Sequence, residues 1–366
     1  MIKGNFDIRL DFLSTSTPPL IGVDISSSSV KMVELSQAPK KGGYVVERYA
    51  IEALPQDSVT DGNINNLDAV ADALRRAWKR MGTRVKNVSL ALPAAAVISK
   101  KILLPSGLRD DDLEMQVEAE ANQYIPFALE EVNLDFQVLG PSAASPDEVE
   151  VLLAASRKAN VDDRVATAQI AGLKTIIVDV EPYAAEAAYA QVRSQLPSGA
   201  PDQCVALIDI GATVMNVNVM RNDQSIYTRD QQIGGAQLTQ MIQNAFGLTA
   251  DEAESGKRNG GLPDNYENDV LTPFRENVAT EITRALQFFF TSTQYNEVNY
   301  IVLAGGCGAL PGLDDAVATR TQVSTLVANP FAQMTLSSRI KPRTLQTDAP
   351  ALMIACGLAM RRFDPS

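Results

Sequence analysis

Two aspartates end apolar runs and are followed by small residues, a context typical of phosphate-binding turns. Asp24 lies in LIGVDISSSSVKMVEL (20–35), and Asp209 lies in VALIDIGATVMNVNVM (205–220). Small side chains leave backbone N–H groups open to phosphate oxygens. Those expected to bind phosphate in this way are Ser26, Ser27, Ser28 and Ser29 after the first aspartate, and Gly211, Ala212 and Thr213 after the second. Both carboxylates are candidate Mg²⁺ ligands that would act largely through water.

The two runs align as an internal repeat. Placing Asp24 on Asp209 puts Ile25 on Ile210 and sets the two groups of small residues opposite each other. One copy alone is explained equally well by an ordinary hairpin whose aspartate and serines make a turn. Because strand, turn, strand, further strand and helix return in the same order, we interpret the repeat as a duplicated lobe. Two such turns would clamp a polyphosphate from both sides.

Other residues could complete a nucleotide pocket. Lys31, on the return strand of the first hairpin, could reach phosphates as a point charge or could be solvated. Gly234 and Gly235 precede an expected helix, whose N-terminus would favour an anion. Glu254 and Lys257, one helical turn apart, could grip a ribose or adenine edge, or form an ordinary surface ion pair.

A third glycine-rich element follows an apolar strand in YIVLAGGCGALPGLDD (300–315). Gly305, Gly306 and Gly308 would let a ligand approach the backbone closely. Their spacing does not match the dinucleotide fingerprint GxGxxG. A tight strand-to-helix turn that binds no ligand is the alternative.

Composition excludes several kinds of chemistry. The chain has no histidine, so a Ser-His-Asp triad and an HExxH zinc site are excluded. The formal charge of -12 argues against binding nucleic acid or anionic lipid. Cys204, Cys307 and Cys356 each lie in an apolar run, so we expect buried thiols rather than disulfides or a metal site.

The sequence also favours a cytoplasmic location. No run approaches the roughly 20 apolar residues of a spanning helix, and the start, 1–19, lacks the apolar stretch of a signal peptide. We therefore expect contact with a membrane only indirectly, through a partner.

The order of these motifs resembles the actin, Hsp70 and sugar-kinase superfamily. In that resemblance, 24–29 and 209–213 are the two phosphate loops and 305–308 is the adenosine loop. More closely, the chain after residue 19 resembles the PilM family of FtsA-like type IV pilus assembly proteins. The sharpest local matches are EAEANQYIPFALEEVNLDFQVLG (118–140), GVDISSSSVKMVEL and EPYAAEAAY.

The resemblance implies an α/β, actin-like (ribonuclease H-like) fold of duplicated lobes with an FtsA/PilM-type inserted subdomain. The implied boundaries are an N-terminal arm at 1–19, lobe I at 20–203 with its insertion at 104–174, lobe II at 204–345 with a small subdomain at 247–296, and a C-terminal helix at 346–366 returning to lobe I.

The resemblance further implies a cytoplasmic scaffold that binds ATP or ADP with Mg²⁺. Its implied partner is the N-terminal cytoplasmic tail of the membrane protein PilN, and through PilN other inner-membrane components of the pilus; self-association stays open. The residues themselves offer a docking candidate at a helix exit, where apolar and aromatic side chains gather, although such clusters can also be core. They are Tyr124, Ile125, Pro126 and Phe127.

Hydrolysis of ATP is left undecided by the residues, and at most a slow ATPase is expected. Ser26 stands where many relatives place glycine, which narrows the first loop. Glu181 is the first candidate for orienting an attacking water and Asp209 the second. Two alternatives remain at this stage: a small-molecule (sugar-type) kinase of the same superfold, and an FtsA-like polymerising membrane tether, whose terminal amphipathic helix the short segment 361–366 does not match.

Overall fold

The structure is a computed structural model, and it describes residues 18–38, 43–142, 145–197 and 202–364. The N-terminal arm expected at 1–19 therefore lies almost wholly outside the described residues. The chain divides into two compact units, described separately below. The first consists of Met1–Leu35, Arg48–Ala184 and Leu358–Ser366, and the second of Ser36–Glu47 and Ala185–Gly357.

The first unit contains most of a six-stranded sheet in the order β10-β6-β1-β2-β3-β16. The short β16, the end of β2 and the start of β3 fall in the second unit. β1 pairs antiparallel with β2 and parallel with β6, and β6 pairs parallel with β10. The strands are β1 (Ile21–Ile25), β2 (Ser29–Gln37), β3 (Tyr44–Ala53), β6 (Asn87–Leu92), β10 (Lys174–Val180) and the short β16 (Thr335–Leu336). A two-stranded hairpin of β4 (Val59–Thr60) and β5 (Asn63–Ile64) follows β3.

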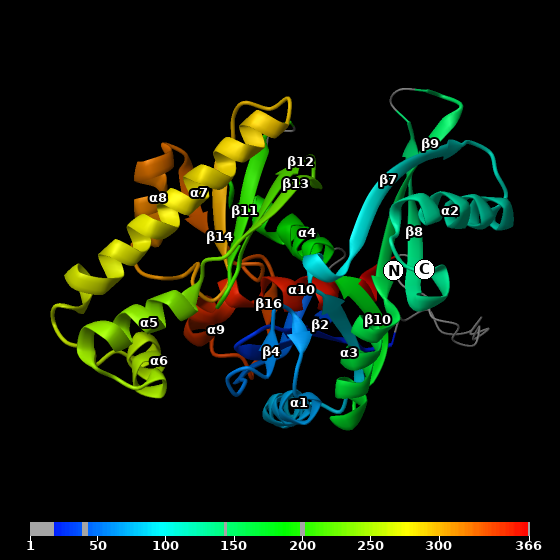
Figure 1. The fold of residues 1–366 in the computed structure, drawn as a ribbon. Helices are drawn as coiled ribbons and strands as arrows, with labels where there is room; N and C mark the ends of the chain where they lie inside the picture. Colours follow the sequence, from blue (N-terminus) through cyan, green and yellow to red (C-terminus); the bar gives the residue numbers. More distant parts are fainter. Residues whose placement is uncertain (1–17, 39–42, 143–144, 198–201, 365–366) are drawn as a thin grey trace. The chain divides into compact units, whose positions relative to one another are not determined.

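Helix α1 (Leu67–Met81) shows how sequence fixes the packing of the first unit. Asn66 caps its start by accepting a bond from the Ala69 N–H, and Gly82 ends it in the left-handed conformation. Its apolar face joins one buried cluster with β1, β2, β6 and the end of α3 (Lys158–Ile170). Figure 1 shows α1 and α3 beside the sheet. The regularly spaced apolar residues of α1 thus form one face that packs against the sheet.

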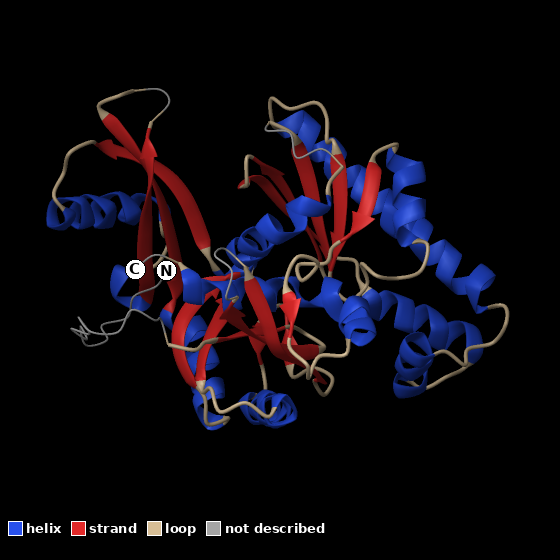
Figure 2. Ribbon diagram, turned by 180° about the vertical axis from the view of Figure 1, so that it is seen from behind, coloured by secondary structure: helices blue, strands red, loops and turns tan. Residues whose placement is uncertain are grey.

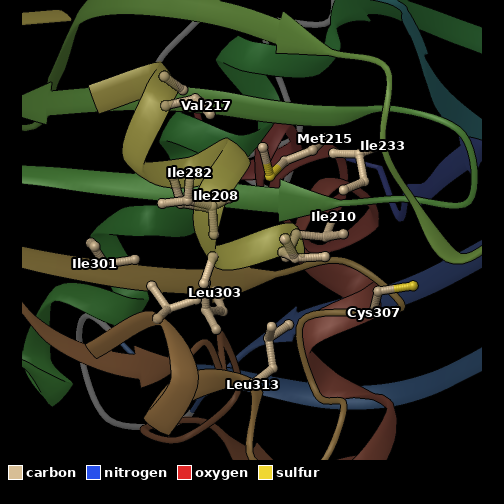
Figure 3. Packing of buried hydrophobic residues seen from close by; sticks show 14 of the residues in the cluster. Ile208, Ile210, Met215, Val217, Ile233, Ile282, Ile301, Leu303, Cys307 and Leu313 are labelled. Carbon is tan, nitrogen blue, oxygen red and sulfur yellow. The ribbon is translucent and has the colours of Figure 1, made fainter. Parts of the chain in front are cut away.

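The second unit contains a five-stranded sheet in the order β13-β12-β11-β14-β15. Its strands are β11 (Cys204–Ile210), β12 (Met215–Arg221), β13 (Gln224–Gln231), β14 (Tyr300–Ala304) and β15 (Ser324–Val327). The helices α7 (Thr272–Ser292) and α8 (Leu313–Thr321) share one buried core with it. Figure 3 shows part of this core, with Ile208 and Ile282 side by side and Cys307 near its margin.

The two sheets repeat one topology, which confirms the predicted duplication. In each, an antiparallel hairpin is extended by a third strand on one side and flanked by a parallel neighbour on the other, so that β6-β1-β2-β3 matches β14-β11-β12-β13. The equivalent hairpins carry Asp24 opposite Lys31 and Asp209 opposite Asn216. The shared topology places each aspartate at the same end of its sheet.

A smaller three-stranded sheet is inserted in the first unit, in the order β7-β9-β8. Its strands are β7 (Ile98–Pro105), β8 (Val132–Pro141) and β9 (Glu148–Arg157), and α2 (Asp110–Tyr124) lies beside it (Figure 2). The insertion expected at 104–174 differs from this sheet at both ends. At the start, β7 already begins at Ile98, before residue 104. At the end, α3 packs against α1 and the main sheet, because its Ala168 belongs to the core of that sheet.

The remaining helices are α4 (Glu181–Val192), α5 (Gly235–Phe246), α6 (Ala250–Asn259), α9 (Pro342–Asp348) and α10 (Met353–Met360). Across the described residues, no helix is both long enough and apolar enough to span a membrane. All three cysteines are free and buried, as the sequence predicts.

Candidate functional site

The first hairpin carries a buried ion pair. Nζ of Lys31 lies 2.8 Å from Oδ2 of Asp24 and donates a 3.1 Å bond to Oγ of Ser26. Asp24 is only 3% exposed. Lys31 is therefore not a solvated lysine, the alternative considered from the sequence, because its ammonium group forms an ion pair with Asp24.

The two turns share one hydrogen bond at equivalent positions. The N–H of Ser26 donates to the carbonyl of Ser29 at 3.0 Å, and the N–H of Gly211 donates to the carbonyl of Val214 at 2.9 Å. Both of these N–H groups are therefore used within their own turns. The sequence had instead predicted that they would be open to phosphate. In the first turn Oγ of Ser26 adds a bond to the same Ser29 carbonyl, so the serine side chain tightens the turn.

The start of α5 is docked against the second turn. The N–H of Gly235 donates to the carbonyl of Gly211 at 3.0 Å, and that of Ala236 donates to the carbonyl of Ala212 at 2.8 Å. A Cβ on Gly234 would lie 2.6 Å from the Gly211 oxygen. The expected anion-binding role does not apply to the Gly235 amide, which holds the turn instead. The glycines are required because the two backbones approach so closely.

The third glycine element reaches the same turn. Gly305 has a φ of +83°, and a Cβ there would lie 2.4 Å from the carbonyl oxygen of Ile210 and 2.5 Å from Oδ1 of Asp209. A Cβ on Gly308 would meet the carbonyl oxygen of Ala304 at 2.4 Å, whereas one on Gly306 would meet nothing within 4 Å. Gly305 and Gly308 serve packing, and only Gly306 borders open space that a ligand could occupy.

Glu254 and Lys257 form a partly buried network between α6 and α5. Nζ of Lys257 donates to Oγ1 of Thr239 at 2.8 Å and to the carbonyl of Gly235 at 3.2 Å, and it pairs with Glu254. Burial works to raise the pKa of Glu254, but Lys257 and then Arg258 and Thr239 outweigh it and lower that pKa. The pair is thus tied to the start of α5 rather than being a solvated contact.

Cys307 and Thr239 belong to this arrangement, although sequence reasoning did not single them out for it. Sγ of Cys307 lies 3.6 Å from the carbonyl oxygen of Gly211. Burial raises the pKa of its thiol to about 11, so it is a packing residue and not a nucleophile. Thr239 follows Gly235 by one helical turn, a spacing that could have indicated a shared face.

The charge of Glu181 acts on a buried arginine, Arg164, that the sequence did not reveal. Glu181 begins α4 directly after β10, and Arg164 on α3 is 2% exposed. Nε of Arg164 donates to the carbonyl of Ala91 at 2.7 Å, and one terminal nitrogen donates to that of Gly62 at 2.9 Å. Burial lowers the pKa of Arg164, and the charges of Glu181 and then Asp24 oppose that effect.

The candidate docking cluster divides into exposed and buried members. Tyr124 and Phe127 are 41% and 40% exposed, and Lys100 and Arg157 lie over their rings at 5.2 and 5.7 Å from the centroids. Ile125 is only 6% exposed because it joins the core of the inserted sheet. Ile125 therefore serves the core of the inserted subdomain, whereas Tyr124 and Phe127 present exposed rings.

Within the described part of the chain, no group of three or more acidic or cysteine side chains could enclose a metal. Mg²⁺ does not need such a cage, since it keeps several waters and often takes one or two carboxylates plus phosphate oxygens.

The model of the family described as type IV pilus assembly protein PilM matches residues 22–363. This chain belongs to the PilM family. Its role is accordingly in type IV pilus assembly. The prediction of that family from the hairpins and from 118–140 is confirmed.

Individual relatives agree with the family. The chain of a solved PilM-PilN type IV pilus biogenesis complex is 28% identical, with a TM-score of 0.79 over 95% of this chain and 100% of that one. The cell division protein FtsA of Streptococcus pneumoniae is 24% identical over 338 residues, 80% of this chain and 71% of FtsA. The ethanolamine utilization protein EutJ of Carboxydothermus hydrogenoformans shares 15% identity, with a TM-score of 0.56 over 94% and 89%. The predicted actin-like fold is thereby confirmed.

Proposed function

We propose that this PilM-family chain is a scaffold that binds ATP with Mg²⁺ and, in that form, holds the N-terminal cytoplasmic tail of PilN. The observation that carries the nucleotide part is the repeated acidic hairpin, joined in the second unit by Gly306 beside open space. The likeness to a PilM-PilN complex over the whole of that chain supports the partner.

Each unit supplies a phosphate-binding turn in this proposal. Main-chain N–H groups of Ser27, Ser28 and Ser29 in the first turn, and of Ala212 and Thr213 in the second, would bind phosphate oxygens. Asp24 and Asp209 would hold Mg²⁺ mainly through its waters. Bound Mg²⁺ would supply charge compensation for the polyphosphate, and Lys31 would share its charge between Asp24 and the ligand.

The adenosine half would be held by the second unit. Gly306 leaves room for the ligand, while Gly305 and Gly308 fix the path of the chain around it. Lys257 and Glu254 would present an edge of the α5–α6 network to the ribose or adenine. Gly234 and Gly235 act indirectly, by letting α5 support the second turn.

Hydrolysis would be slow. Oγ of Ser26 bonds the Ser29 carbonyl and accepts from Lys31, so the first turn is closed tightly around its own groups. Glu181 would orient an attacking water and Asp209 would assist it. Single-turnover phosphate release that is unchanged in Glu181→Gln would remove Glu181 from this role.

The exposed aromatics of the inserted subdomain are the proposed contact for PilN. Tyr124, Pro126 and Phe127 are exposed at the end of α2, and large exposed aromatics are common anchors of peptide recognition. Through PilN the chain would be held at the inner membrane from the cytoplasm and would reach the other membrane components of the pilus. Self-association is not needed for this role.

The test measures ATP affinity in the presence of Mg²⁺ with and without a synthetic peptide of the PilN tail from the same organism. If one closed form serves both ligands, the peptide tightens ATP binding by the same factor as ATP tightens peptide binding. Equal, non-zero affinities in both arms would remove the coupling. Absence of ATP binding in both arms would contradict the nucleotide role itself.

A further inference from the structure

Arg164 stands out because its charge is buried and its hydrogen bonds end on neutral groups. The side chain is 2% exposed, and its two bonds go to the backbone carbonyls of Ala91 and Gly62. Burying an arginine costs considerable free energy unless nearby negative charge compensates it. Its position should therefore serve something besides packing.

The strand register places this guanidinium at a particular edge of the sheet. Ala91 lies opposite Asp179 in β10, and Leu90 lies opposite Val23, the residue before Asp24 in β1. These are the carboxyl ends of three adjacent parallel-running strands, the edge at which open α/β sheets bind ligands. Glu181 begins at the same edge, immediately after β10.

Several carboxylates at this edge are held in ion pairs, and Arg361 pairs with both Asp179 and Asp364. Asp24 is bound by Lys31 at 2.8 Å, and Asp179 is bound by Arg361 at 2.6 Å. Burial lowers the pKa of Arg164, and of the carboxylates that oppose this effect Glu181 acts most strongly, followed by Asp24. Removing the charge of Arg164 would make this edge more negative, and an incoming polyphosphate would meet a less favourable potential.

We propose that Arg164 is a positioning residue whose buried positive charge, at the same sheet edge as the first acidic hairpin and Glu181, raises the affinity of this unit for polyphosphate. The inference rests on the proposed nucleotide function. Arg164 does not touch the ligand; it acts through the field at Asp24 and Glu181 and through the strand end that it anchors. Arg164 should favour highly anionic ligands, so the effect of removing its charge should grow with the negative charge of the ligand.

The experiment compares the affinities of Arg164→Met, Arg164→Gln and Arg164→Lys for ATP and for adenosine, by calorimetry with Mg²⁺ present. We expect the two neutral variants to bind ATP about tenfold more weakly, with adenosine affinity changed less than about twofold, because adenosine carries no charge. Arg164→Lys should restore most of the ATP affinity. Should Arg164→Met not fold, the glutamine and lysine variants still differ in charge and decide the question.

A matched control is Arg75→Met. Arg75 also donates to a carbonyl of α3, that of Ile170 at 2.9 Å, but it lies on the exposed side near Asp72. It should leave both affinities unchanged. Equal losses for ATP and adenosine, or a lysine variant as weak as glutamine, would overturn the inference while leaving the nucleotide function in place. A wild-type protein that binds no ATP would overturn both.

Discussion

Lys31 and Asp24 lie directly opposite each other in the first hairpin and form an ion pair of 2.8 Å. The second hairpin carries Asn216 at the position of Lys31, and Asn216 bonds Asp230 at 2.6 Å instead. The repeated hairpins are thus alike in backbone and different in charge. The first turn neutralises its own aspartate, whereas the second has no lysine at that position.

Lys31→Met should destabilise the protein by about 3 kcal/mol, because it leaves a buried carboxylate without its cation. The side chains of Lys31 and Asp24 are only 12% and 4% exposed. Denaturant unfolding measures the change. The control is Arg284→Met, which breaks an exposed pair with Glu281 and should cost less than about 0.5 kcal/mol. Similar small costs for both variants would show that the hairpin pair is not structurally important.

Gly305→Ala should lower folding stability, whereas Gly306→Ala should lower nucleotide affinity. Alanine at Gly305 combines a φ of +83° with a 2.4 Å approach to the Ile210 oxygen, so it should cost about 3 kcal/mol of folding free energy. Alanine at Gly306 meets nothing within 4 Å and should fold normally. It should nevertheless weaken nucleotide binding, since its methyl group enters the space proposed for the ligand.

Thermal unfolding and ATP titration of the two glycine variants separate these effects. If Gly306→Ala binds ATP as tightly as the wild type, the open space beside Gly306 is not part of the nucleotide site. If Gly305→Ala is as stable as the wild type, the third glycine element does not pack as closely against the second turn as described.

Glu254 should make stability depend on pH in the acidic range. Its pKa is lowered from 4.5 in the folded chain, with burial opposing and Lys257 chiefly causing the decrease. A carboxyl of this kind stabilises the fold above its unfolded pKa, and the contribution is lost as pH falls through the lower folded value. The stability difference between wild type and Glu254→Gln should therefore shrink as pH is lowered from about 6 to about 3. Urea unfolding at each pH tests this, and a difference that widens on acidification would contradict it.

The docking cluster offers a matched pair of variants. Phe127→Ala removes an exposed ring and should reduce affinity for the PilN-tail peptide with little change in stability. Ile125→Ala removes a core side chain and should cost about 3 kcal/mol of folding free energy. Peptide titration and denaturant unfolding of both variants are the measurements. Unchanged peptide affinity in Phe127→Ala would move the contact elsewhere.

Much of the fold was predictable because local patterns were consistent. The repeated run from apolar strand to aspartate to small residues predicted both hairpins, and the apolar spacing with Asn66 and Gly82 at its ends sufficed for α1. The carboxylates and the third glycine element were found for the same reason. Each depends on neighbours in sequence.

What could not be predicted depends on contacts between distant segments. Lys31 needed the strand register before its pairing with Asp24 could be recognised. The amide of Gly235 needed the position of the second turn, which alone shows that this donor is used. Arg164 contacts residues far away in sequence, and no local pattern distinguishes a buried arginine on a helix from a solvated one.

The central claim is that both acidic hairpins bind one Mg²⁺-bearing nucleotide. Calorimetric titration of ATP with Mg²⁺ into the wild type, Asp24→Asn and Asp209→Asn tests it most directly, with the folding of each variant checked by circular dichroism. The account predicts one binding site in the wild type and about tenfold or greater weakening in each variant, together with loss of Mg²⁺ dependence. Binding that is equally tight in all three proteins, or that is absent in the wild type, would contradict it.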